Sequence, residues 1–185
     1  MRGRRGEPAA ERRDQRMDLL LRPYREEDLP AITALWNQVV EQGDSFPGDR
    51  PLSPGEAADM FAAQTDTIVA CGDGEVVGLY ILHPNNIGRC SQIANASYAV
   101  RRDRRGGGIG RRLVCDSLRR AKARGFAGMQ YNAVVKSNTA AIALYLKLGF
   151  TVLGTVKNGY RLADGRLTDT LIFYYGLADG ELPPP

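Results

Sequence analysis

Apolar residues recur along the chain in two rhythms. In four segments they return every three or four positions, which predicts helices with one buried face. In seven others they alternate or run together over four to eight positions, which predicts strands. The predicted helices begin after Asp28 and cover residues 56–63, 111–124 and 138–148. The predicted strands cover residues 19–22, 67–71, 76–82, 93–100, 129–135, 151–156 and 168–175.

The order of these elements predicts the fold class. Helices interleave with strands that lie close enough in sequence to form hairpins, with turns at Gly72-Asp73-Gly74 and around Asp164-Gly165. We therefore expect an α/β fold: a mixed, mostly antiparallel, twisted sheet of about seven strands, flanked by about four helices.

Length and composition fit a single domain of this kind. The chain has 185 residues, of which 43% are hydrophobic and 25% charged. We expect residues 18–177 to form the domain and residues 178–185 to form a C-terminal tail. Residues 1–17 lack apolar periodicity and are expected to form a disordered basic arm. Six arginines and three acidic residues in positions 1–16 account for most of the net charge of +4, which argues against a nucleic-acid partner for the domain.

Other sequence signals concern location and metals. No apolar run approaches the roughly 18 residues that span a bilayer, so we expect no membrane segment. The three cysteines, Cys71, Cys90 and Cys115, are odd in number and scattered, which favours a reducing, cytoplasmic location. Only one histidine, His83, is present, and no cysteine pair has ligand spacing, so we expect no metal site.

The segment Arg105-Gly-Gly-Gly-Ile-Gly110 carries the clearest chemistry. Glycine tolerates positive φ and lets backbone N–H groups converge, and the start of a helix adds unpaired N–H groups and a positive dipole end. Arginines flank the segment on both sides, so we predict a phosphate site. Arg111 excludes a Walker A loop, which needs Gly-Lys-Ser/Thr, and also a dinucleotide fingerprint, which needs a small residue there.

Two segments resemble the GCN5-related N-acetyltransferase family. Val100, four further residues and then Arg105-x-x-Gly108-x-Gly110 are similar to that family's acyl-CoA loop. Residues 138–150, an asparagine with a tyrosine seven positions later and Gly-Phe at the end, are similar to its second characteristic segment. The resemblance runs from Met17 to about Tyr175. It implies acetyl-CoA as co-substrate and a sheet that is splayed between its fourth and fifth strands.

The resemblance also implies site residues. Tyr145 would be the general acid that protonates the departing thiolate, and the backbone near Tyr98 would donate to the acetyl carbonyl. The coenzyme-binding residues would be Tyr98, Ala99, Val100, Arg105, Gly106, Gly107, Gly108, Ile109, Gly110, Arg111, Asn138 and Tyr145. Many family members carry a Glu or Asp on strand four as the base, whereas residues 93–100 hold no carboxylate, so the base stays unassigned.

Asn95 and Asn132 are the further catalytic candidates, because they lie on the two strands that the resemblance splays apart. A carboxamide offers both a donor and an acceptor, which suits the carboxylate and amine of an amino acid. The alternative is two buried asparagines bonded to the backbone. Residues 84–91, 131–134 and 154–159 resemble the branch that acetylates proline analogues such as azetidine-2-carboxylate, in which asparagines at these places line the acceptor site.

The sequence therefore favours an acetyl-CoA-dependent N-acetyltransferase whose partner is a small-molecule amine, an amino acid or an analogue that acetylation would detoxify. One alternative is a protein or peptide N-acetyltransferase, which predicts an open acidic groove. Another is a non-catalytic acetyl-CoA-binding regulatory module, against which the intact Tyr145 counts. The oligomeric state stays open, a homodimer included.

Overall fold

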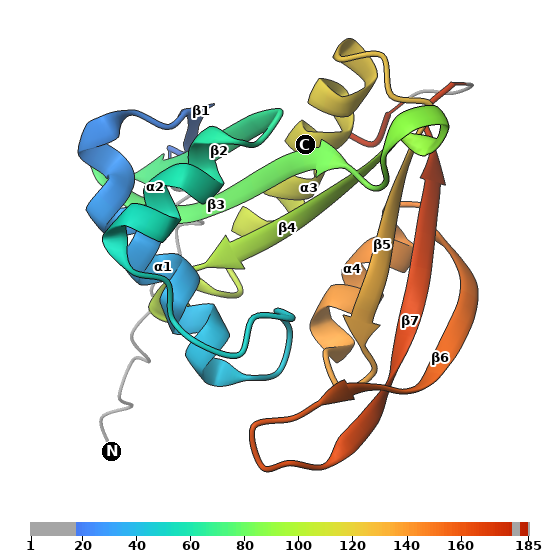
Figure 1. Ribbon diagram of the computed structural model, residues 1–185. Helices are drawn as coiled ribbons and strands as arrows, with labels where there is room; N and C mark the ends of the chain where they lie inside the picture. The colour runs from blue at the N-terminus through green and yellow to red at the C-terminus, as the bar shows by residue number, and fades with distance from the viewer. Residues whose placement is uncertain (1–17, 179–181, 185) are drawn as a thin grey trace, which may run out of the picture.

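The computed structural model describes residues 18–178 and 182–184 (Figure 1). The predicted arm at residues 1–17 lies outside the described residues. The described chain contains seven strands: β1 (Leu20–Pro23), β2 (Asp66–Gly72), β3 (Glu75–Pro84), β4 (Ile93–Val100), β5 (Gly128–Val135), β6 (Thr151–Arg161) and β7 (Leu167–Gly176). It contains four α-helices: α1 (Leu29–Gln42), α2 (Pro54–Ala62), α3 (Ile109–Ala123) and α4 (Thr139–Lys147).

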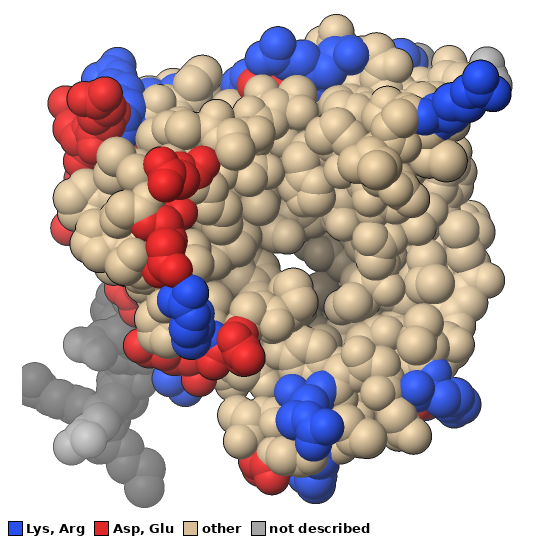
Figure 2. Space-filling model, in the orientation of Figure 1, with Lys and Arg blue, Asp and Glu red and all other residues tan. Residues whose placement is uncertain are grey.

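All seven strands form one sheet in the order β1-β2-β3-β4-β5-β7-β6. Neighbouring strands are antiparallel except β4 and β5, which are parallel and pair only at Ile93 with Gly128 and at Ala94 with Met129. Beyond these pairs the two strands diverge (Figure 1), and the space-filling view shows an opening between the two halves of the molecule (Figure 2). The predicted mixed sheet with its splay is confirmed.

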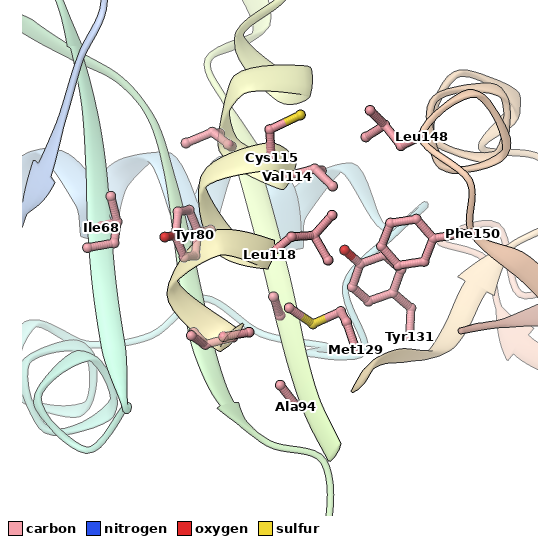
Figure 3. Close-up of a cluster of buried hydrophobic side chains, with 14 of the residues drawn as sticks. Ile68, Tyr80, Ala94, Val114, Cys115, Leu118, Met129, Tyr131, Leu148 and Phe150 are labelled. Carbon is pink, nitrogen blue, oxygen red and sulfur yellow. The ribbon is translucent and has the colours of Figure 1, made fainter. Parts of the chain in front are cut away.

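Each face of the sheet is covered by two helices. Because side chains alternate along a strand, Val69 and Leu79 pack with α1 and α2, while Ile68 and Tyr80 pack with α3 on the opposite face. The core on the α3 face continues to the second half of the molecule, where Figure 3 shows two aromatic rings side by side. These are Tyr131 and Phe150, stacked with centroids 4.9 Å apart. Because Tyr131 lies on β5, this stack supports that strand where it diverges from β4.

Several element boundaries differ from the sequence prediction, and two of the differences have a clear physical cause. The helix predicted from residue 111 begins at Ile109, because Gly108 adopts the left-handed conformation and ends the loop there. The strand predicted to end at residue 156 continues to Arg161. β6 is an edge strand whose residues are mostly exposed, so apolar and polar residues alternate only weakly in its second half. This half is a strand because it pairs with β7.

Part of the segment predicted as a C-terminal tail lies against α3. The guanidinium of Arg111 donates to the carbonyl of Pro184 at 2.9 Å, and Arg119 donates to that of Pro183 at 3.3 Å. Leu182 packs against the core on this face.

Candidate active site

Two cavities open where β4 and β5 separate. The larger, of about 550 Å³, lies over the glycine-rich loop and the start of α3. The smaller, of about 350 Å³, lies between the diverging strands. The two share a wall, made of Ser45, Tyr98, Asn138, Ala141 and Tyr145. A ligand in one cavity can therefore meet a ligand in the other.

The glycine-rich loop has the conformation that an anion site requires. Gly106 and Gly108 have φ values of +85° and +79°, and an added Cβ at either would meet no atom within 4 Å. Backbone conformation rather than space therefore demands glycine here. Gly108 is the N-cap of α3 and offers no side-chain cap, so the first N–H groups of the helix stay available for a ligand.

Arginine side chains give the larger cavity its charge. Arg104, Arg105 and Arg111 line it, and Asp44 is the one acidic residue in the lining among the described residues. Arg105 is held in place because it donates to Gln42 at the end of α1, at 2.8 Å. This end of the cavity is therefore suited to a polyanionic ligand such as a pyrophosphate.

Most of the predicted coenzyme residues line the larger cavity. They are Tyr98, Val100, Arg105, Gly106, Gly108, Ile109, Gly110, Arg111, Asn138 and Tyr145. Gly107 and Ala99 do not, and the buried Ala99 packs toward α1. Asn138 also caps α4, because its Oδ1 accepts from the N–H of Ala141 at 3.3 Å. Its Nδ2 group donates no hydrogen bond within the described residues.

The free edge of β4 offers backbone donors to the cavities. The N–H of Arg101 donates to Val77 on β3 at 2.9 Å. N–H groups alternate between the two edges of a strand, and the β3–β4 register is regular, so the N–H groups of Tyr98 and Val100 face the splay. These two amides stand where the resemblance expects donors to the acetyl carbonyl.

Tyr145 borders both cavities with a free hydroxyl. Its ring packs against Tyr131, Phe150 and Phe173, with centroids 4.7, 5.5 and 5.5 Å away. Within the described residues its hydroxyl makes no hydrogen bond. Burial raises the pKa of Tyr145 above its ordinary value, so the phenol stays protonated at neutral pH.

Three hydroxyl groups near Tyr145 form a chain of hydrogen bonds in which each proton is already donated. Ser117 donates to the carbonyl of Val114 at 2.8 Å, so it must accept from Tyr98 at 2.7 Å. Tyr98 then accepts from Tyr131 at 2.7 Å, because each hydroxyl has one proton. Tyr145 is therefore the phenol of this group with a proton to give. No local sequence pattern predicts this chain, because its members come from three separate elements, α3, β4 and β5.

Asn95 and Asn132 both line the smaller cavity and are linked through Asn85. The Nδ2 groups of Asn95 and Asn132 donate to Oδ1 of Asn85 at 3.2 and 2.6 Å, and Gln130 donates to Oδ1 of Asn132 at 2.9 Å. Asn85 was not among the predicted site residues. Its only signal was its place in the segment 84–91, which resembles the proline-analogue branch.

The loop after α1 and the β6–β7 hairpin meet at the acceptor side. Phe46 and Pro47 line the smaller cavity, and the Tyr160 hydroxyl donates to the Phe46 carbonyl at 2.8 Å. Gly43, with φ +60°, comes so close to Ala163 that an added Cβ would lie 2.8 Å from its Cβ. No charged side chain lines this cavity in the described ranges, and tan residues surround the opening in Figure 2.

The described residues contain neither a cluster of metal-ligating side chains nor a helix suited to crossing a membrane. In residues 18–178 and 182–184, no group of three or more His, Cys, Asp or Glu side chains could hold a metal ion. No helix in these ranges has both the length and the apolar character to cross a membrane.

The comparisons with known proteins assign the family. Residues 29–150 match the model of the acetyltransferase (GNAT) family. The chain is 30% identical to N-acetyltransferase aca1 of Schizosaccharomyces pombe, over 82% of this chain and 81% of the relative. It is 31% identical to an L-methionine sulfoximine/L-methionine sulfone acetyltransferase of Pseudomonas aeruginosa, over 69% and 77%. The chain belongs to the GNAT family and is an acetyltransferase.

A solved structure agrees with this assignment. The phosphinothricin acetyltransferase of Sinorhizobium meliloti, in complex with AcCoA, superimposes with a TM-score of 0.82 and is 27% identical, covering 91% of this chain and 94% of that structure.

Proposed function

We propose that this protein transfers the acetyl group of acetyl-CoA to the amine of a small amino-acid analogue. The observation that carries the proposal is the common wall of the two cavities, in which the free Tyr145 hydroxyl lies. The larger cavity takes the coenzyme, with its pyrophosphate at the N–H groups of the glycine-rich loop and beside Arg105. The smaller cavity takes the acceptor.

The reaction follows from the groups at this wall. The N–H groups of Tyr98 and Val100 stabilise the oxyanion that forms when the acceptor nitrogen attacks the thioester carbonyl. The new C–N bond forms, the C–S bond breaks, and the Tyr145 phenol protonates the departing thiolate. The attacking nitrogen loses its proton to water, which also restores the phenol.

The acceptor binds as the free amine. The lining of the smaller cavity offers no carboxylate or imidazole in the described part of the chain, and Asp44 belongs to the larger cavity. Only about 0.1% of an amine with a pKa near 10 is neutral at pH 7. Turnover is therefore expected to rise with the neutral fraction of the acceptor amine.

The size and polarity of the smaller cavity favour a compact acceptor. About 350 Å³ lined by amides, serines and aromatic rings fits an amino-acid analogue with an uncharged side chain. The relatives named for methionine sulfoximine and phosphinothricin support the amino-acid class, and the resemblance to the proline-analogue branch supports a cyclic secondary amine. The hydrogen bond from Tyr160 to the carbonyl of Phe46 ties the β6–β7 hairpin to the loop beside this cavity, which disfavours a peptide chain as acceptor.

A thiol-release assay with acetyl-CoA tests this proposal. The acceptors are azetidine-2-carboxylate, proline, methionine sulfoximine, phosphinothricin, a polyamine and a short peptide, and mass spectrometry identifies the N-acetyl product. We expect turnover of the amino-acid analogues above that of the polyamine and the peptide. Faster turnover of the peptide would contradict the proposal.

A further inference from the structure

Asn85 lies where β4 and β5 separate. It follows the last residue of β3, and its N–H donates to the carbonyl of Ile93 at 2.7 Å, which fixes it beside the start of β4. The last paired residues of β4 and β5 are Ala94 and Met129. Asn85 is half-buried and lines neither cavity. It therefore reaches the acceptor site only through the side chains that it contacts.

The side-chain oxygen of Asn85 joins the two diverging strands. It accepts from Nδ2 of Asn132 on β5 at 2.6 Å and from Nδ2 of Asn95 on β4 at 3.2 Å. A carbonyl oxygen has two lone pairs, so these two donors occupy it fully. The bonds hold both cavity-lining amides at a fixed separation.

The same bonds fix which atoms each amide presents to the cavity. Asn132 gives one N–H to Asn85 and accepts from Gln130 at 2.9 Å, so it has a second N–H and one remaining lone pair of its oxygen to offer. Asn95 gives one N–H to Asn85, while its Oδ1 accepts no hydrogen bond within the described ranges. Two asparagines that look alike in the sequence thus differ in their oxygens: Oδ1 of Asn132 is already engaged by Gln130, whereas Oδ1 of Asn95 is the open acceptor among the described residues.

We propose that Asn85 is the positioning residue of the acceptor site, an inference that rests on the proposed function. Its oxygen turns Asn132 to donate to the acceptor's carboxylate and leaves Oδ1 of Asn95 to accept an N–H from the acceptor's amine. An amine held in this way keeps its lone pair directed toward the thioester. Without the Asn85 oxygen both amides could rotate about their terminal torsion, and the amine would lose its orientation.

Three variants test the role by kinetics. Asn85→Leu removes the oxygen at similar size, Asn85→Asp keeps an oxygen acceptor, and Asn86→Leu changes an exposed neighbour whose Oδ1 accepts only from the N–H of Ile87. With the fastest acceptor of the panel, Asn85→Leu should lower kcat/KM for the acceptor about tenfold and leave the KM for acetyl-CoA unchanged. Asn85→Asp should restore at least half of the parent value, and Asn86→Leu should match the parent.

Two results would overturn the role. Parent-like acceptor kinetics in Asn85→Leu would show that the oxygen positions nothing. A joint loss of acetyl-CoA affinity and thermal stability would show a merely structural residue. Adding Asn85→Leu to a variant that already carries Asn95→Ala and Asn132→Ala should cost little more, because Asn85 acts through those side chains. If Asn85→Leu lowered kcat/KM in the double alanine variant by the same factor as in the parent, that result would also contradict the inference.

A spectroscopic measurement separates this inference from the proposed function. The side-chain amide ¹⁵N–¹H resonances of Asn95 and Asn132, assigned with the alanine variants, should shift in Asn85→Leu and not in Asn86→Leu. Unshifted resonances would contradict the inference whatever amine the enzyme acetylates. Shifted resonances in an enzyme that turns over no small amine would contradict the proposed function alone.

Discussion

The two cavities that meet at Tyr145 are built in opposite ways. The coenzyme cavity depends on the backbone, with left-handed residues at Gly106 and Gly108 within one short loop. The acceptor cavity depends on side-chain amides that three separate elements bring together. A donor site can therefore be specified by a few consecutive residues, whereas acceptor choice is specified by tertiary contacts. Substitutions can therefore alter the acceptor cavity without altering the coenzyme cavity.

The pH dependence is the largest expected effect and belongs to the acceptor half. Because the acceptor must enter as the free amine, kcat/KM for an amine of pKa near 10 should rise about tenfold per pH unit from pH 6 to 9. Burial raises the pKa of Tyr145, so its phenol stays protonated over this range and causes no fall in rate. Initial rates at saturating acetyl-CoA measure the profile. A descending limb below pH 9 would contradict the assigned roles.

Tyr145→Phe removes the proton donor at the common wall. General acids contribute about 100-fold or more, so kcat should fall by about that factor while the KM for acetyl-CoA changes less than about twofold. Tyr131→Phe is the matched control, because that hydroxyl lies in the same aromatic cluster but donates to Tyr98. Steady-state kinetics of the two variants measure the difference. Equal losses in kcat would show that the free hydroxyl has no special role.

Gly108→Val tests the coenzyme half. A side chain at positive φ costs about 1–2 kcal/mol, and the displaced loop should lose hydrogen bonds to phosphate, raising the KM for acetyl-CoA about 10- to 100-fold. Gly125→Val carries the same strain, at φ +84° beyond the far end of α3, with no cavity beside it. If both variants bound acetyl-CoA alike, the loop would not be the phosphate site.

Tyr160→Phe is the smallest change and concerns the hydrogen bond that ties the β6–β7 hairpin to the loop beside the acceptor cavity. One hydrogen bond contributes about 1 kcal/mol, so its loss should raise the acceptor KM about threefold or less. Tyr174→Phe, on the partner strand of the same hairpin, should have no effect, because the Tyr174 hydroxyl lies beside Gly128 and not against the loop after α1. Acceptor KM values of both variants test this. An equal rise in the acceptor KM of both variants would show that the hydrogen bond from Tyr160 to Phe46 has no particular role in acceptor binding.

The sequence was sufficient for the parts of the molecule that depend on local patterns. Apolar periodicity gave seven strands and four helices, and the spacing from Val100 to Gly110 led to the loop that starts α3. The edge strand β6 was predicted too short because pairing with β7 needs no apolar alternation.

The rest depends on contacts between distant residues. Asn85 lies 10 and 47 positions from its two partners, and no local pattern connects them. The order of the hydroxyl chain requires the bond from Ser117 to Val114 before the free phenol can be recognised. The disorder expected for residues 1–17 and the cytoplasmic location stay predictions, and the oligomeric state stays open.

One pair of kinetic measurements tests the separation of the two halves directly. Initial rates with acetyl-CoA and the acceptor both varied give two KM values for Gly108→Val and for Asn95→Ala. We predict that Gly108→Val raises only the KM for acetyl-CoA. We predict that Asn95→Ala lowers kcat/KM for the acceptor about tenfold and leaves the KM for acetyl-CoA unchanged. Loss of acetyl-CoA binding in Asn95→Ala, or of acceptor binding in Gly108→Val, would contradict the account.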